Sequence, residues 1–360
     1  MTTRVPEIAM LRKRIGSAKV VFHSNAWNEV YSEVLGVVAT PASELVRRVA
    51  LPCLRKAGPC VWLAVVWSDG RTVAKVSDAY NKIDDKADLV FALENAGVPE
   101  SFTPWSVVLT AESDHTLIKG KNFKSMILKP ANGYGGEGII IVNSVVEAMT
   151  HIRASEALAA ELPFACEAAP QRFVLQEFIH SITVDNQPFH LRTYAARVDG
   201  KSYVYIANHE VRVAKPENFI TNGLAGADRR LLSQLFDPSL GDRLAAFVAS
   251  ICLTLVPDCN DTREFIEKVD DHANEDDEEK LALVNNEDCF AVAGIDIILD
   301  SEDNMLKLLE FNVNPACPKK IEVSELFWNH LCRFASALLS LTLHQYHPDF
   351  RLASELLHAS

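Results

Sequence analysis

Residues 127–143 read ILKPANGYGGEGIIIVN, and the glycines in this stretch match the spacing G-x-G-x-x-G. In a dinucleotide-binding unit such glycines open a helix, whose N-terminus then meets the pyrophosphate. Here Gly138 is followed by Ile-Ile-Ile-Val, which is typical of a strand, and a helix start is signalled only at Ser144 with Glu147. The sequence therefore predicts that the glycines join two strands as a hairpin. Such a hairpin is either simply flexible or folds its backbone N–H groups over an anion.

The composition is that of an ordinary globular protein. The chain has 360 residues, of which 48% are hydrophobic and 23% charged, and its length suits two or three subdomains. A net charge of −13 argues against a general nucleic-acid binder, because phosphate neutralisation requires clustered Lys and Arg. Neither a secretory signal nor a run of about 20 apolar residues stands out, so we expect a cytoplasmic protein without a membrane span.

Three minor features have simple interpretations. The eight cysteines are scattered without a C-x-x-C pair, which predicts reduced and mostly buried thiols. His344 and His347 form a loose pair that is more typical of surface histidines than of a zinc site. The acidic run DDHANEDDEE at 270–279 is most simply a solvated loop or insertion.

Strand-like and helix-like segments alternate in the first third of the chain, which indicates an α/β arrangement. Helix 84–97 has a continuous apolar face and ends at Gly97, which suits a C-terminal cap. The other expected strands lie at 19–24, 60–68, 172–180, 189–214 with a turn at Asp199-Gly200, 293–300 and 305–315, and the other expected helices lie at 43–58, 228–256 and 322–343.

Polar side chains interrupt the last two apolar strands. In LKLLEFNVN the side chains alternate between faces, so Glu310, Asn312 and Asn314 project from the same side. The preceding strand carries Asp296, and the short connection SEDN suits a hairpin in which Asp296 lies opposite Glu310. Carboxylate and amide oxygens suit Mg²⁺, which is usually completed by water and substrate phosphates. The alternative is an ordinary polar sheet edge or strand end.

Taken together, several segments resemble the ATP-grasp superfamily in order and spacing, and within it the tubulin tyrosine ligase family. They are DDKADLVFALENAGVPESFTPW (84–105), the glycine stretch, VLQEFI, G-I-D and E-F-N-V-N-P, and the resemblance covers about residues 80–335. It implies an α/β (α+β) protein with the ATP-grasp fold. A Rossmann-like N-terminal α/β domain (1–80) would precede a central subdomain with the glycine hairpin (81–180) and a C-terminal subdomain with the Mg-binding strands (181–360), and these last two would clasp ATP.

The resemblance also implies roles for individual residues. Lys86 and Lys129 would contact the ATP phosphates under Gly133, Gly135, Gly136 and Gly138; Gln176, Glu177, Phe178 and Ile179 would hold the adenine; Arg192 and Arg212 would face the substrate carboxylate and the transferred phosphate; Thr221 and Asn222 would line the reaction site; and Asp296, Glu310 and Asn312 would bind Mg²⁺. The chain departs from the family at Pro188 and His190, where a lysine and an aspartate are usual. The segment from Arg212 to Asn222 is also shorter than usual.

The implied activity is that of an ADP-forming acid–amino-acid ligase. ATP would activate a carboxylate as an acyl phosphate, and an amino acid would then be joined to a protein C-terminal tail, such as that of tubulin, or to a small acid. Tubulin is the less secure acceptor, because its tails are acidic and this chain is too. Two other functions stay open: an ATP-grasp kinase for a polyphosphorylated small molecule, which needs a more basic pocket than the composition indicates, and a nucleotide-binding scaffold without turnover.

Overall fold

The structure is a computed structural model. It describes the strands 19–22, 40–41, 63–66 and 72–75, and the residues 25–35, 80, 83–114, 125–133, 135–160, 171–198, 200–216, 218–219, 221, 226–258, 289–313, 315, 317–342 and 346–359. Some predictions therefore lie outside the described residues. These are helix 43–58, the acidic run 270–279, Asn222, Asn314 and His344.

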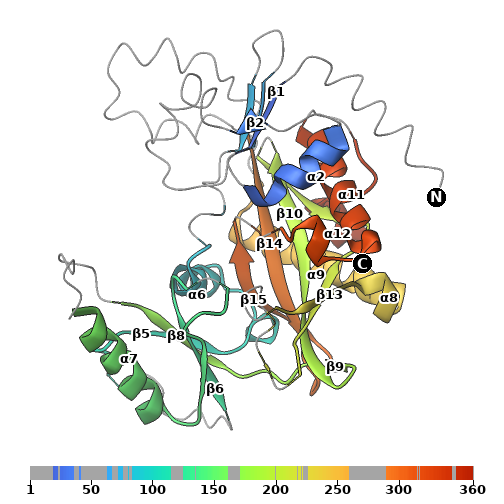
Figure 1. The fold of residues 1–360 in the computed structure, drawn as a ribbon. Coiled ribbons are helices and arrows are strands. Elements are labelled where there is room, and N and C mark those ends of the chain that lie inside the picture. The colour runs from blue at the N-terminus through green and yellow to red at the C-terminus, as the bar shows by residue number, and fades with distance from the viewer. Residues whose placement is uncertain are drawn as a thin grey trace, which may run out of the picture.

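A large, mostly antiparallel sheet forms the centre of the molecule (Figure 1). Its long strand β10 (Gln187–Val198) pairs with β14 (Cys289–Leu299) on one side and with β12 (Glu210–Val213) and β11 (Lys201–Tyr205) on the other. The remaining strands are β9 (Thr183–Val184), β13 (Asp228–Leu231), β15 (Leu306–Asn312) and β16 (Phe350–Leu352), which pair with β10, β12, β14 and β11 respectively.

The N-terminal strands extend this same sheet. They are β1 (Lys19–Phe22), β2 (Thr40–Pro41), β3 (Leu63–Val66) and β4 (Thr72–Lys75), and β4 joins β14 in a parallel pair. Because β1 with β3 and β3 with β4 pair antiparallel, this part does not have the parallel order of a Rossmann unit within the described strands. The division into domains 1–80, 81–180 and 181–360 stays a prediction.

Alternation along β10 gives the large sheet two different faces. The odd-numbered Leu191 and its apolar neighbours pack on α9 (Pro238–Leu255) and α12 (Ala353–Ala359) in a mainly apolar layer. On the opposite face Tyr194 and Ala196 pack on α2 (Asn25–Leu35) and α11 (Glu325–Thr342). Each large apolar side chain buried in these layers contributes about 1.5–3 kcal/mol. Further along the same strands, this second face becomes polar, and the candidate site lies there.

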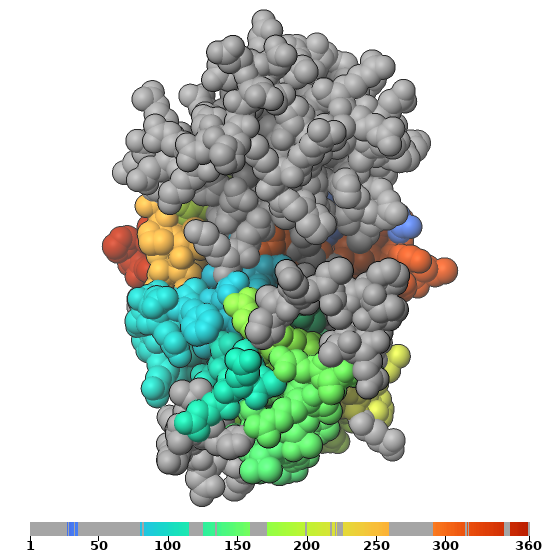
Figure 2. Space-filling model, turned by 90° about the vertical axis from the view of Figure 1, so that its left-hand side faces the viewer, coloured from blue at the N-terminus to red at the C-terminus, as the bar shows by residue number. Residues whose placement is uncertain are grey.

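A smaller antiparallel sheet lies beside one end of the large one, with α6 (Lys86–Asn95) between them (Figure 1). Its strand order is β5 (Ser106–Leu109), β8 (Phe173–Glu177), β6 (Met126–Pro130) and β7 (Ile140–Val142). Helix α7 (Val145–Ala160) covers one face through Met149 and Ile152, and α6 covers the other through Ala87 and Val90. Figure 2 shows α7, in green, at the surface on this side of the molecule.

The glycine segment joins β6 and β7 as an antiparallel hairpin, as its sequence predicted. Met126 pairs with Val142 and Leu128 with Ile140. The helix follows the hairpin and begins only at Val145, where the hydroxyl of Ser144 accepts a hydrogen bond from the backbone N–H of Glu147 at 3.1 Å. The glycines therefore do not open a helix, and the dinucleotide interpretation is excluded.

We expect Gly138→Ala to destabilise the protein more than Gly97→Ala. Both glycines have a left-handed backbone, with φ of +70° and +65°, which costs an alanine about 1–2 kcal/mol. A Cβ at position 138 would also lie 2.8 Å from Cγ of Pro130, whereas at 97 nothing lies within 4 Å. Urea unfolding of the two variants measures the difference, and equal losses would contradict the tight packing of the hairpin on Pro130.

The helix predictions are largely confirmed, with one error. Asp85 caps α6, and Gly97 follows its end as expected. The predicted helix 228–256 is wrong at its start, because 228–231 form β13 against β12, and the long helix α9 begins only at Pro238 after the cap Asp237. Between them lies the short helix α8 (Leu232–Leu235). The predicted helix 322–343 is α11, preceded by a 3-10 turn.

Helix α9 is long and apolar enough to cross a membrane by length and composition alone. The sequence had indicated no such segment. Its Leu244, Val248 and Ile251 are buried in the core against the large sheet, which is where helices of this composition occur in globular proteins. Cys252 of the same helix is a free, buried thiol, as are Cys317 and Cys332, which agrees with the expectation of reduced cysteines.

Candidate active site

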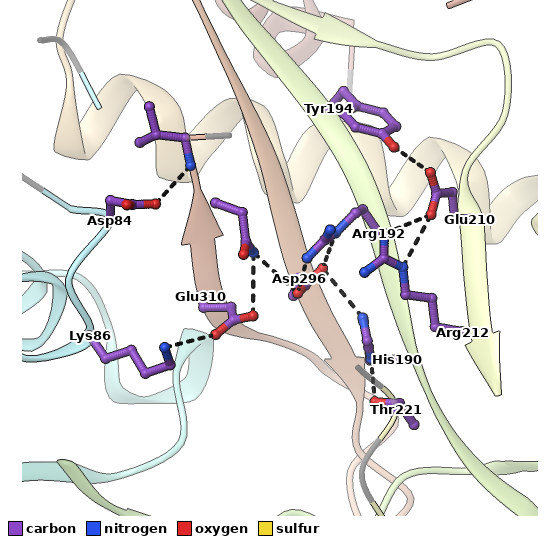
Figure 3. Close-up of polar contacts among 12 residues, drawn as sticks. Asp84, Lys86, His190, Arg192, Tyr194, Glu210, Arg212, Thr221, Asp296 and Glu310 are labelled. Carbon is purple, nitrogen blue, oxygen red and sulfur yellow. Dashed lines mark hydrogen bonds and ion pairs between the residues drawn. The ribbon is translucent and has the colours of Figure 1, made fainter. Parts of the chain in front are cut away.

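The acidic strand pair has the predicted register. Asp296 on β14 lies opposite Glu310 on β15, and Gly294 lies opposite Asn312. Nδ2 of Asn312 donates to Oδ2 of Asp296 and to Oε1 of Glu310, both at 3.3 Å, so the amide holds the two carboxylates together (Figure 3). A register shift between Asp296 and Ile297 marks a bulge directly beside this group, which is a common device for aiming a functional side chain.

Lys86 contacts both Glu310 on β15 and the glycine hairpin. It is the first residue of α6, directly after the cap Asp85. Its Nζ donates to the backbone oxygen of Gly133 at 2.6 Å and lies 3.6 Å from Oε2 of Glu310 (Figure 3). The preceding Asp84 accepts a hydrogen bond from the backbone N–H of Val313, just beyond β15, at 2.8 Å. The glycine hairpin and strand β15, which carries Glu310 and Asn312, therefore border the same space.

Lys129 lies on the face of the smaller sheet that α6 and the site share. It is buried, and its Nζ donates to Oε1 of Gln176 at 2.6 Å, while Nε2 of Gln176 donates to the hydroxyl of Ser106 at 2.9 Å. The pKa of Lys129 is lowered to about 8, mainly by burial and also by the charge of Lys86, against the raising effects of Glu310 and Asp296. Lys129 is thus a cation held in place close to Glu310 and Lys86.

The predicted adenine-binding segment links the two sheets. Gln176 is buried, whereas Glu177, Phe178 and Ile179 are partly exposed at the end of β8. The backbone N–H of Glu177 donates to the oxygen of Trp105 at 2.8 Å, and the ring of Phe178 lies edge-on to Phe219 with centroids 6.2 Å apart. Of the hairpin glycines, Gly135, Gly136 and Gly138 all have positive φ, and Gly133 contacts Lys86 through its carbonyl oxygen.

Arg192 is engaged with Asp296 rather than free. Its Nε and Nη2 donate to the two carboxylate oxygens of Asp296 at 2.6 and 2.5 Å, in the two-pronged geometry that suits a guanidinium and a carboxylate (Figure 3). His190 places Nε2 3.4 Å from the same carboxylate and joins Nδ1 to the hydroxyl of Thr221. Burial would raise the pKa of Asp296, but the charge of Arg192 and the contact with His190 keep it well below its usual range.

Arg212 belongs to a second buried ion pair on the neighbouring strand. Its Nε and Nη2 donate to Oε2 of Glu210 at 3.1 and 3.0 Å, and the hydroxyl of Tyr194 donates to Oε1. Burial alone would raise the pKa of Glu210, but the charges of Arg212, Arg229 and Arg192 outweigh it and lower the pKa to about 2. Burial and the charge of Arg192 together lower the pKa of Arg212.

The oxygen atoms of the site suit a magnesium ion whose coordination shell is completed by a bound ligand and water. Within the described part of the chain, no group of three or more His, Cys, Asp or Glu side chains could hold a metal ion alone. Glu310 and Asn312 offer carboxylate and amide oxygens on one face, whereas both oxygens of Asp296 already accept from Arg192. Mg²⁺ usually takes only one or two carboxylates and completes its shell with water and phosphates, so this small set is sufficient.

The charge balance of the site is cationic, in contrast to that of the chain. Five cationic side chains face four carboxylates here: Lys86, Lys129, Arg192, Arg212 and Arg229 against Asp84, Asp296, Glu310 and Glu210. A buried excess of positive charge is suited to a polyanion such as a nucleotide triphosphate. The net charge of −13 therefore does not describe this surface.

Direct contacts join Lys86, Gly133, Arg192, Asp296, Glu310 and Asn312 of the predicted site, and another contact joins Lys129 to Gln176. The structure also adds residues that the sequence reasoning missed. Glu210, Tyr194, Asp84 and Ser106 position the predicted side chains. The signal for Glu210 was available, because in E-V-R the glutamate and Arg212 are two residues apart and share one face of a strand. Asp84 and Ser106 left no signal, because their contacts come from distant strands.

Residues 79–258 match the model of a family described as YheC/D-like ATP-grasp. The chain belongs to the YheC/D-like ATP-grasp family. The matched residues include α6, the glycine hairpin and the ion-paired Arg192 and Arg212. They end before β14 and β15, which carry Asp296, Glu310 and Asn312. No curated protein matches the chain in sequence. The expected ATP-grasp superfamily is confirmed, whereas the tubulin tyrosine ligase family is not.

Membership of the YheC/D-like ATP-grasp family has direct consequences for function. It makes the chain an ATP-dependent ligase of the ATP-grasp type, and enzymes of this type use ATP and typically Mg²⁺. The mixed helices and antiparallel sheets fit the α+β character of the fold. The roles of single residues stay predictions.

Proposed function

We propose that this YheC/D-like ATP-grasp protein is a carboxylate–amine ligase that works through an acyl phosphate, in the manner of the tubulin tyrosine ligase family. One observation carries the proposal: Lys86 contacts both the glycine hairpin and Glu310, so that the phosphate-covering and metal-binding elements line one space. The acid substrate would be a protein C-terminal tail, including that of tubulin, or a small acid, and the amine would come from an amino acid. The enzyme would act in the cytoplasm.

The chemistry follows from the poor reactivity of a carboxylate. Its leaving group would be oxide, so an amine cannot displace it directly. A carboxylate oxygen would attack the γ-phosphorus of ATP, the bond to the β-phosphate oxygen would break, and ADP would leave. The amine would then attack the acyl carbon, phosphate would leave with the former carboxylate oxygen, and the amine would lose a proton. Phosphoryl transfer is mainly positioning and charge stabilisation, which suits a site of fixed cations.

The proposed roles follow the positions of the side chains. Lys86 and Lys129 would neutralise the phosphates, and the hairpin around Gly135 and Gly136 would exclude water that would hydrolyse the acyl phosphate. The other assignments stay as inferred: Gln176, Glu177, Phe178 and Ile179 hold the adenine; Arg192, Arg212 and Asn222 serve the reacting carboxylate and phosphate; and Asp296, Glu310 and Asn312 hold Mg²⁺. When bound, the metal would neutralise charge on the phosphates.

A kinase acting on a polyphosphorylated small molecule is the second candidate. It needs a basic site, and five cationic side chains around four carboxylates give the site a small positive excess despite the acidic chain. ADP release separates the candidates. ADP that appears only when an amine is added supports the ligase, whereas ADP that appears with phosphorylation of an alcohol supports the kinase. Nucleotide binding without any ADP release would leave a scaffold.

The decisive experiment measures ADP release from Mg²⁺-ATP across a panel of amino acids, with and without tubulin and with small acids as acceptors. Mass spectrometry then identifies the product. The expected result is an amide whose mass equals that of the acid plus the amino acid minus water. Phosphorylated products in place of amides would contradict the ligase proposal.

We expect the affinity for ATP to fall as the pH rises through about 8, because the buried Lys129 then loses its proton. Its pKa is lowered from 10.5 to about 8, and bound phosphates would raise it again, so ATP binding takes up a proton above this pH. A charged hydrogen bond contributes about 1.5–3 kcal/mol, so Lys129→Ala should weaken ATP binding roughly tenfold or more.

Lys129→Arg is the matched control for this prediction, because a guanidinium stays charged at every pH of the titration. Isothermal titration of wild type, Lys129→Ala and Lys129→Arg between pH 7 and 9.5 compares the three. The fall in affinity should appear in wild type alone. An identical pH profile in all three proteins, or unchanged affinity in Lys129→Ala, removes Lys129 from the nucleotide site.

A further inference from the structure

One partly buried arginine of the site shares its counter-ion with another arginine. Arg229 on β13 lies directly opposite Arg212 on β12, in a sheet where like charges at paired positions are destabilising. Its side chain is 14% exposed, and its Nη1 is buried without a hydrogen-bond partner within the described residues. A guanidinium that has only a distant, shared counter-ion in such a place is costly, and it cannot lose its charge.

The nearby carboxylate of Glu210 is engaged by two other residues. Oε1 accepts from the hydroxyl of Tyr194, and Oε2 accepts from both Nε and Nη2 of Arg212 at 3.1 and 3.0 Å. Nη1 of Arg229 lies 3.9 Å from Oε2, which is beyond hydrogen-bonding distance. Glu210 therefore pairs closely with Arg212 and only distantly with Arg229.

The next residue along β13, Arg230, has close counter-ions of its own. Arg230 points to the other face of β13, is 33% exposed, and contacts Asp185 at 2.6 Å and Asp228 at 2.7 Å. Two carboxylates thus serve the more exposed arginine, while the more buried Arg229 has only a distant share of Glu210. This contrast indicates that the guanidinium of Arg229 is available to bind an anionic group of a ligand.

We propose that Arg229, beside Arg212, binds a second anionic group of the acid substrate, so that the enzyme favours acids with more than one anionic group. This inference rests on the proposed ligase function. Nη2 of Arg212 and Nη1 of Arg229 lie 3.0 and 3.9 Å from the same oxygen of Glu210, so the second group would bind next to the group that Arg212 serves.

The test measures binding rather than turnover. The full chain, loaded with Mg²⁺ and a non-hydrolysable ATP analogue, is titrated calorimetrically with acetyl-Glu-Glu-Glu and with acetyl-Gln-Gln-Glu, which share one C-terminal carboxylate. Wild type should bind the first peptide at least tenfold more tightly. Arg229→Gln should abolish this preference, Arg229→Lys should retain part of it, and Arg230→Gln, the matched control on the same strand, should leave it unchanged.

Several results would overturn the proposal. These are the absence of a preference in wild type, equal losses in Arg229→Gln and Arg230→Gln, or a loss in Arg229→Gln that affects both peptides alike. Should Arg229→Gln fail to fold, Arg229→Lys decides, because a point charge cannot reproduce the two-pronged contact and the preference should still fall. Tricarballylate is the small-molecule arm. Tight binding of tricarballylate that does not depend on Arg229 would also contradict the subsite.

The outcome is distinguishable from a failure of the ligase proposal. If no acid supports ADP release but the preference for triglutamate depends on Arg229, the anion subsite stands and the ligase falls. If acids with a single carboxylate are joined to amines equally well by wild type and Arg229→Gln, and wild type shows no preference for triglutamate, the ligase stands and the subsite falls.

Discussion

Glu310→Gln should reduce ADP release at least a hundredfold while leaving the fold intact. The substitution keeps the size of the side chain and its hydrogen bond with Asn312 but removes the charge that faces Lys86 at 3.6 Å and that would bind Mg²⁺. Fixed charges aimed at the reacting phosphates contribute factors of about 10²–10³ to the rate. Steady-state ADP release and far-UV circular dichroism measure the two parts of this prediction.

Glu302→Gln is the matched control, because Glu302 is exposed in the turn between β14 and β15 and contacts none of the site residues described above. A second measurement isolates the metal. In wild type the affinity for ATP should rise on addition of Mg²⁺, and in Glu310→Gln this rise should disappear while metal-free ATP binds as before. A folded Glu310→Gln variant with normal ADP release would contradict the metal assignment.

Arg192→Met should destabilise the protein by about 3–5 kcal/mol, the usual cost of leaving one partner of a buried ion pair alone. Both side chains of the Arg192–Asp296 pair are almost fully buried, at 3% and 2% exposed, and the two hydrogen bonds between them are short. Guanidinium chloride unfolding at pH 7 gives the difference directly. A loss below about 1 kcal/mol would show that Asp296 does not depend on Arg192 for its charge.

The double variant Arg192→Met with Asp296→Leu tests the cause. Replacing both partners of a buried pair by apolar groups is often neutral or stabilising, so the double variant should recover most of the lost stability. The pH dependence gives a further check. In wild type Arg192 lowers the pKa of Asp296, so the pair stabilises the fold above the ordinary Asp range and this contribution is lost on acidification. Without Arg192 that pKa rises, so the gap between Arg192→Met and wild type should narrow toward pH 4.

Much of the fold near the site was predictable, because local pattern and tertiary structure agree there. Four β-branched residues after Gly138 excluded a helix, and alternation along E-F-N placed Glu310 and Asn312 on one face. The segment 228–231 was not predictable. D-R-R-L has no alternation of apolar residues, and it becomes a strand only because it pairs with β12.

The partners of the arginines were beyond the sequence for a similar reason. Arg192 and Asp296 are 104 residues apart, so nothing local shows that the guanidinium is held by a carboxylate. The resemblance to tubulin tyrosine ligases gave both arginines substrate-facing roles, whereas in the structure each contacts a carboxylate of the protein. Such engagement depends on strand order, which pairs β10 with β14 and β12.

Successive residues of β10 face opposite sides of the sheet. Leu191 faces the apolar layer of α9, whereas His190 and Arg192 face the polar side. Deleting or inserting one residue between Pro188 and Arg192 would turn the guanidinium toward the apolar helices and an aliphatic side chain toward the nucleotide. A substitution on β10 therefore alters one face of the sheet, whereas a change in the length of β10 would disrupt both the packed core and the polar site.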